Sequence, residues 1–116
     1  MRRKRNKFGA IKTVVDGITF SSKLEANRYK ELKLLEQSGV IQKLKRQVRF
    51  NLTVNDILIC FYLADFTYNE NNSLIVDESK GKETAVWRLK KKLFQACYPH
   101  LELRMNGVRV KPTRRR

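Results

Sequence analysis

Apolar residues recur every three or four positions between residues 24 and 35, which is the period of an α-helix. The stripe expected to face the core is Leu24, Arg28, Leu32 and Leu35, flanked by Glu25, Tyr29 and Glu36. Ser21 and Ser22 precede the segment as candidate N-caps, and Gly39 is a natural helix stop. The pattern therefore predicts a first helix that follows Ser22 and ends at Gly39.

From residue 47 the period changes to two, because apolar residues at 48, 50, 52 and 54 alternate with polar ones. Asn55-Asp56 is a two-residue hairpin signal, so a second strand should follow over residues 57–68. That strand is apolar on both faces until Asp65, which predicts a central strand covered on both sides. After a polar turn at 69–72, residues 74–80 form the next strand, and the three strands should make an antiparallel meander.

The remaining elements are shorter. Gly81 closes the meander, residues 83–98 read as a second helix stopped by Pro99, and residues 101–105 alternate as a last strand. Near the start, Asp16-Gly17 indicates a small hairpin within residues 13–20. The predicted fold class is α/β, with a mixed sheet that contains the antiparallel meander and is flanked by two helices.

Length and charge divide the chain into a body and two arms. With 116 residues there is room for one domain, which we place at residues 13–108. Of the net charge of +15, eleven units lie in two acid-free segments, residues 1–12 and 109–116. Their basic residues are Arg2, Arg3, Lys4, Arg5, Lys7, Lys12, Arg109, Lys111, Arg114, Arg115 and Arg116. The body carries only +4, so the ends are predicted to be basic arms on a nearly balanced fold.

Basic arms of this kind favour a nucleic-acid partner, because each neutralised phosphate releases condensed counterions. The alternative is that they are solvated tails. A membrane partner is not expected, since no apolar run approaches the roughly 20 residues of a membrane span. The basic start lacks the apolar core of a signal peptide, so we expect a cytoplasmic protein. Cys60 and Cys97 lack zinc-site spacing and are predicted to be small core residues.

Three side chains with complementary chemistry lie at the ends of two predicted neighbouring strands. Alternate residues of a strand share a face, so Glu78 and Lys80 point one way while Asp77 and Ser79 point the other. Asp65 comes late in the preceding strand, and hairpin neighbours lie about 5 Å apart. Asp65 also interrupts an apolar run in which a charged residue without a role is not expected, because burying an unpaired carboxylate costs free energy. Two carboxylates and one ammonium are therefore predicted to meet at one spot.

Such a group suits the hydrolysis of a phosphodiester bond. A hard divalent cation such as Mg²⁺, held by carboxylates, can polarise a phosphoryl oxygen and lower the pKa of a bound water. Lys80 can orient or deprotonate that water and offset charge in the transition state. The backbone carbonyl of Ser79 is a further candidate ligand. We therefore predict Asp65, Glu78 and Ser79 as metal ligands, with the two carboxylates and Lys80 as catalytic residues.

The ordered set of Asp65, Glu78-Ser79-Lys80 and a helical Glu25 resembles the PD-(D/E)XK, or restriction-endonuclease-like, nuclease superfamily. The resemblance runs from Ser21 to Met105, although Ala64 stands where the superfamily's name has a proline. Four short segments are similar to short phage proteins of that superfamily that are often suggested to be Holliday junction resolvases. These are residues 22–26 (SKLEA), 64–66 (ADF), 80–81 (KG) and 89–94 (LKKKLF).

The resemblance implies an αβββαβ restriction-endonuclease-like core and a Mg²⁺-dependent endonuclease, with Mn²⁺ as a substitute. It implies a branched DNA substrate such as a four-way junction, and action in the host cytoplasm if the gene belongs to a phage. It also implies that Glu25 is a catalytic metal ligand and that Lys90 is a catalytic residue contacting phosphate. The expected DNA-binding residues are Arg88, Lys91 and Lys92 on the second helix, together with Arg2, Arg3, Lys4, Arg5, Arg114, Arg115 and Arg116 in the arms.

Each site residue also has a structural interpretation. Glu25 completes a capping box with Ser22, which would satisfy the helix start without any metal. Glu78 and Lys80 could be a surface ion pair, worth under about 1 kcal/mol. Lys90 projects among apolar residues of its helix and could simply extend its stem to the rim.

One small subunit with one site cuts one strand, so paired cleavage indicates a homodimer with isologous contact. The strand around residues 61–62 or the first hairpin could supply that contact. The rival function is a non-catalytic DNA-binding module on the same fold. A ribosomal-type RNA-binding protein would explain the charge but would leave the acidic cluster without a role.

Overall fold

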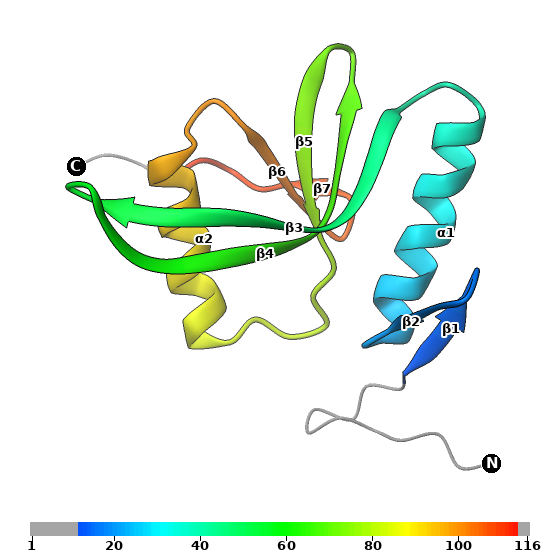
Figure 1. Cartoon of the computed structure of the whole chain (residues 1–116), viewed down its shortest axis with the longest axis horizontal. Helices are drawn as coiled ribbons and strands as arrows, with labels where there is room; N and C mark the ends of the chain where they lie inside the picture. The colour runs from blue at the N-terminus through cyan, green and yellow to red at the C-terminus, as the bar shows by residue number, and fades with distance from the viewer. Residues whose placement is uncertain (1–11, 114–116) are drawn as a thin grey trace.

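The computed structural model describes residues 12–113, and it is an α/β fold with a mixed five-stranded sheet and two helices (Figure 1). The strand order is β3-β4-β5-β6-β7, in which only β5 and β6 run parallel. A separate two-stranded sheet, β1-β2, packs beside α1. The elements are β1 (Thr13–Val15), β2 (Ile18–Phe20), α1 (Lys23–Gln37), β3 (Gln42–Val54), β4 (Ile57–Glu70), β5 (Ser73–Glu78), α2 (Ala85–Cys97), β6 (Glu102–Met105) and β7 (Val108–Arg109).

Two hydrophobic clusters lie on either side of the site region. In the first cluster, α1 and β2 pack against the second half of β4 and against β5. In the second cluster, α2 packs against the β3–β4 hairpin and β6. The β5–α2–β6 segment is a crossover between parallel strands, which places α2 against the sheet (Figure 1). No helix in the described part of the chain is long and apolar enough to cross a membrane.

The first helix is confirmed, but its buried stripe differs from the predicted one. Ser22 caps α1 by accepting a hydrogen bond from the Glu25 N–H at 3.1 Å. The buried positions are Glu25, Ala26, Tyr29 and Leu32, whereas Leu24 is 42% exposed. The helix is therefore rotated toward Glu25, because the aromatic ring of Tyr29 packs against Phe20 and Phe66. This rotation turns Glu25 toward the sheet.

The meander is confirmed, with β3 starting at Gln42, five residues before the predicted start. The extra stretch carries mostly polar and basic residues and so shows no alternation. Lys43 and Gln47 also have positive φ values of 56° and 52°, which interrupt a regular strand. Gln47 lies between the pairs Arg46–Phe66 and Val48–Ala64, opposite Asp65. The hairpin bends there, so residues 62 and 64 pack in the second cluster while 66 and 68 pack in the first.

The prediction that residues 57–68 are covered on both faces is wrong for the first half of β4. Ile57, Ile59, Phe61 and Leu63 are between 43% and 64% exposed, while Tyr62 and Ala64 are buried against α2. Only one face of this part of the hairpin has a helix behind it (Figure 1). Because β4 is apolar on both faces, its first half leaves several apolar side chains exposed to solvent.

Both ends of the predicted second helix, residues 83–98, shift slightly, because α2 spans Ala85–Cys97. Thr84 is the N-cap of α2 and accepts from the Trp87 N–H at 3.0 Å, so the helix begins at Ala85 rather than at residue 83. The chain continues as ordered structure beyond residue 108, since Arg109 lies in β7 and the Lys111 carbonyl accepts a hydrogen bond from Gln95.

Candidate functional site

Asp65 lies where β4 bends, with its carboxylate next to the end of β5. Its Oδ2 accepts a hydrogen bond from the Ser79 N–H at 2.9 Å. Burial and the nearby charge of Glu78 raise the pKa of Asp65 to about 8. A carboxyl group whose pKa is raised in this way loses its proton more readily when a cation binds beside it.

Glu78 is the second carboxylate, and it is buried at the last position of β5 with 3% of its surface exposed. The Tyr62 hydroxyl donates a hydrogen bond to Oε2, and Lys80 Nζ lies 3.7 Å from Oε1. Glu78 also interacts electrostatically with Asp65, since the charge of Glu78 contributes to the raised pKa of Asp65. Burial raises the pKa of Glu78 as well. The convergence predicted for Asp65, Glu78 and Lys80 is thus present.

Asp77 points to the opposite face, as strand alternation predicted. It is fully buried on the α1 side, where the Arg28 guanidinium donates to both its oxygens at 3.2 and 2.8 Å. The Tyr68 hydroxyl donates to the same carboxylate at 2.6 Å. Because Arg28 lies one helical turn beyond Glu25, this bridge fixes α1 against β5 next to Glu78.

Lys80 is held by packing and by the backbone around it. Its ammonium lies 5.1 Å from the centre of the Trp87 ring, which in turn packs on Tyr62. The Asn106 side chain accepts from the Lys80 N–H at 3.0 Å and donates to its carbonyl at 2.8 Å. Asn106 also donates its own N–H to the Glu78 carbonyl at 2.9 Å. The end of β5 is therefore fixed although the strand stops at Glu78.

Glu25 is buried at the start of α1 and faces the same region. Its Oε1 accepts from Ser21 Oγ at 2.9 Å, and its Oε2 accepts from Gln47 Nε2 at 3.2 Å, with Arg46 at 3.9 Å. Burial raises the pKa of Glu25, and the charge of Asp65 raises it further. The Glu25 carboxylate thus lies between α1 and the sheet. The helix cap is the separate hydrogen bond from the Glu25 N–H to Ser22 Oγ.

The chemistry of this cluster fits a divalent cation. Within residues 12–113 no group of three His, Cys, Asp or Glu side chains is already arranged as a metal cage. The buried polar side-chain atoms that lack a hydrogen-bond partner in this part of the chain are Arg46 Nε, Ser79 Oγ and Trp87 Nε1. Two of them are N–H donors, which cannot coordinate a cation. The fit to a cation therefore rests on the carboxylate oxygens of Asp65, Glu78 and Glu25, which are the hard ligands that Mg²⁺ takes.

Other predicted site residues lie elsewhere. The Lys90 ammonium lies 5.6 Å from the ring centre of Phe61, and no ion pair among residues 12–113 joins it to the three carboxylates. The structure therefore does not bring Lys90 into the carboxylate cluster and places its ammonium over the Phe61 ring instead. Lys91 pairs with Glu83 at 2.8 Å, whereas Arg88 and Lys92 are exposed. Arg2, Arg3, Lys4, Arg5, Arg114, Arg115 and Arg116 lie outside the described residues.

Several residues of the site were not predicted from sequence. Arg46 and Gln47 contact Glu25, Tyr62 donates to Glu78, and Trp87 packs against Lys80. Their contacts depend on the bend of β3 and on the packing of α2, which no local pattern reveals. Asn106 had a usable signal, since Asn106-Gly107 is a hairpin-turn dipeptide and both residues have positive φ.

Comparison with known proteins gives one match. A family model described as "Protein of unknown function (DUF1064)" matches residues 5–111. No curated protein and no solved structure matches the chain. The match covers all three carboxylates and Lys80, together with both sheets and both helices.

Proposed function

We propose that this chain, which belongs to the DUF1064 family, is a Mg²⁺-dependent endodeoxyribonuclease with a restriction-endonuclease-like core. The observation that carries the proposal is the convergence of Asp65, Glu78 and Lys80 at the end of β5, where the half-buried Asp65 carboxylate accepts from the Ser79 N–H and the buried Glu78 carboxylate lies 3.7 Å from the Lys80 ammonium. A buried pair of acids destabilises the fold unless it serves a ligand. A divalent cation is the ligand that this pair suits.

Asp65 and Glu78 would hold the cation, and Glu25 would contribute charge from α1. The cation, when bound, supplies Lewis acidity and a water of lowered pKa. Lys80 lies beside Glu78 Oε1, where its ammonium can orient the attacking water and offset charge on the phosphoryl oxygens. Tyr62 and Trp87 exclude bulk water from this side and fix the two side chains. Ser79 has its N–H engaged by Asp65, and its carbonyl remains a candidate ligand.

DNA would approach the cluster along basic side chains that carry no buried partner. Arg88 and Lys92 are exposed on α2, and the arms add further positive charge. Affinity of this kind comes from phosphate neutralisation and carries no sequence preference. We propose structure-specific cleavage of branched DNA in the cytoplasm, because the segments similar to suggested junction resolvases point to that substrate. A four-way junction is the first substrate to examine.

The proposal is tested by incubating the full-length protein with four-way junction, flap, nicked and linear duplex DNA in Mg²⁺, Mn²⁺, Ca²⁺ or chelator. We expect cleavage in Mg²⁺ and Mn²⁺, with the junction cut fastest, and none in chelator. Cleavage that persists in chelator would contradict a metal-dependent mechanism. Tight binding to every DNA without any cleavage would instead support a non-catalytic DNA-binding module on the same fold.

A further inference from the structure

Lys80 lies beyond the end of its strand. β5 stops at Glu78, and its parallel pairing with β6 ends at the pair Glu78–Met105. A residue past the end of a ladder receives no hydrogen bonds from a neighbouring strand, so its backbone needs another partner to stay fixed. The turn that follows β6 supplies that partner.

Asn106, in this turn, takes the place of a strand residue with its side chain. The Lys80 N–H donates to Asn106 Oδ1 at 3.0 Å, and Asn106 Nδ2 donates to the Lys80 carbonyl at 2.8 Å. A neighbouring strand binds a residue in the same way, by accepting from an N–H and donating to a C=O. The Asn106 backbone N–H also donates to the Glu78 carbonyl at 2.9 Å. One residue therefore holds both Glu78 and Lys80.

The turn that carries Asn106 is itself packed against the first helix. Asn106 and Gly107 have positive φ values of 53° and 80°, as a tight Asn-Gly turn requires. A Cβ atom on Gly107 would lie 3.5 Å from Arg28 Nη1, so the turn lies directly on this guanidinium. Arg28 is fixed by its two hydrogen bonds to the buried Asp77 of β5. Asn106 is thus held in place although it is exposed.

The side chain of Lys80 has few other contacts to hold it. It is 33% exposed, and its ammonium lies 3.7 Å from Glu78 Oε1 and 5.1 Å from the Trp87 ring centre. Ion pairs and cation–π contacts of partly exposed side chains are weak. The place of the ammonium therefore depends on where the backbone of Lys80 is fixed.

We propose that Asn106 is a positioning residue for Lys80. Its side-chain amide fixes the Lys80 backbone, and this keeps the ammonium beside Glu78. The consequence for cleavage rests on the proposed nuclease function, whereas the consequence for the position of Lys80 does not.

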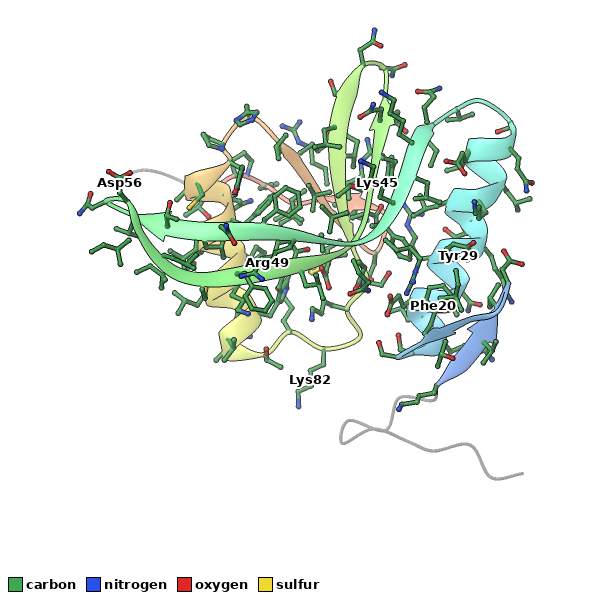
Figure 2. The ribbon with its side chains drawn as sticks, in the orientation of Figure 1. Phe20, Tyr29, Lys45, Arg49, Asp56 and Lys82 are labelled. Atoms are coloured by element: carbon green, nitrogen blue, oxygen red, sulfur yellow. The ribbon has the colours of Figure 1, made fainter. Side chains whose placement is uncertain are left out.

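The accessibility of the Lys80 amine tests the proposal without any cleavage assay. Reductive methylation of the full-length protein, followed by peptide mass spectrometry, should modify Lys80 more slowly than Lys82, which is exposed and points away from the fold (Figure 2). Asn106→Gly removes the amide and keeps the turn, because glycine adopts positive φ freely. Methylation of Lys80 should then rise severalfold while that of Lys82 stays the same. An unchanged rate at Lys80 overturns the proposal.

Asn55→Gly is the matched control. Asn55 also has a positive φ, 49°, and it is exposed in the turn at the tip of the β3–β4 hairpin. This variant should keep the wild-type rate of methylation at Lys80. All three proteins are compared well below their melting temperatures, so that each is folded. An equal rise at Lys80 in both variants would show general loosening of the fold and would overturn the proposal.

In DNA cleavage, Asn106→Gly should lower kcat roughly tenfold, since two hydrogen bonds of typical net strength are lost. The KM for DNA and the affinity for Mn²⁺ should stay unchanged. The carboxylates keep their own contacts in this variant, because Asp65 accepts from the Ser79 N–H and Glu78 accepts from Tyr62. If Mn²⁺ affinity falls together with kcat, Asn106 supports the whole cluster and the proposal is wrong.

A double-mutant cycle shows whether Asn106 acts through Lys80. Single-turnover cleavage with the enzyme in excess, which keeps slow reactions measurable, is compared for the wild type, Asn106→Gly, Lys80→Met and the double variant. Asn106→Gly should have no further effect once Lys80 is replaced. Losses that multiply in the double variant overturn the proposal. A wild type that cuts no DNA would refute the nuclease, and the methylation rates would still decide the role of Asn106.

Discussion

Glu78→Gln is expected to reduce DNA cleavage by roughly 100-fold or more, while leaving the melting temperature in chelator equal to or above that of the wild type. The loss follows because the variant removes one of two cation-holding carboxylates, whose effect on the transition state is of that order. Stability is preserved because the charged form of Glu78 is disfavoured by burial, and a neutral amide can still accept from Tyr62. Cleavage rates and calorimetric scans measure the two effects.

The neighbouring acid should behave in the opposite way. Asp77→Asn breaks a buried bridge to Arg28, which costs about 3–5 kcal/mol in comparable pairs, so the protein should melt lower. Its cleavage at low temperature should remain substantial, since Asp77 faces away from Lys80. Glu83→Gln serves as a second control, because this carboxylate pairs with Lys91 on the surface. Equal losses of cleavage at positions 77 and 78 would contradict the assignment of faces along β5.

In chelator, thermal stability should fall as pH rises from about 4 to about 8. Asp65, Glu78 and Glu25 all have pKa values raised by burial, and that of Asp65 reaches about 8. Over this range the unfolded chain ionises Asp65 while the folded chain keeps its proton, and the raised pKa values of Glu78 and Glu25 act in the same direction, so unfolding becomes easier. Below about pH 4 both states are protonated and the cost disappears. A change of ~1 kcal/mol shifts the midpoint of a domain this size by about 4–8 °C.

Asp65→Asn should flatten this slope and melt higher than the wild type at pH 8, because one buried charge is lost. Mg²⁺ or Mn²⁺, binding only the folded state, should raise the wild-type midpoint and leave the variant unchanged. The comparison isolates Asp65 from the general effect of net charge, which both proteins share. A variant less stable than the wild type in chelator would make Asp65 a structural acid.

The parts of this structure that local chemistry determines were predictable. The cap at Ser22 and the turns at Asp16-Gly17 and Asn55-Asp56 lie where the sequence places them. The alternation of side chains along a strand also placed Glu78 and Asp77 on opposite faces correctly, since both lie in a regular part of β5.

The rest depends on tertiary packing. The bend at Gln47 turns β4, so a strand with apolar residues on both faces buries only one of them before Asp65. The rotation of α1 is set by Tyr29 against Phe66, and it exposes Leu24, which the helical wheel assigned to the core. Tyr62 contacts Glu78 and Trp87 contacts Lys80, but no sequence pattern distinguishes these two residues from ordinary aromatic residues of a core.

Titration of Mn²⁺ into the wild-type protein at pH 8 tests the metal centre most directly. We expect saturable heat of binding accompanied by proton release, because the carboxyl group of Asp65 must ionise to hold the cation. The signal should be lost in Asp65→Asn and retained in Asp56→Asn, an exposed acid at the hairpin tip (Figure 2). Binding that is absent from the wild type, or that survives unchanged in Asp65→Asn, would contradict a metal centre formed by Asp65 and Glu78.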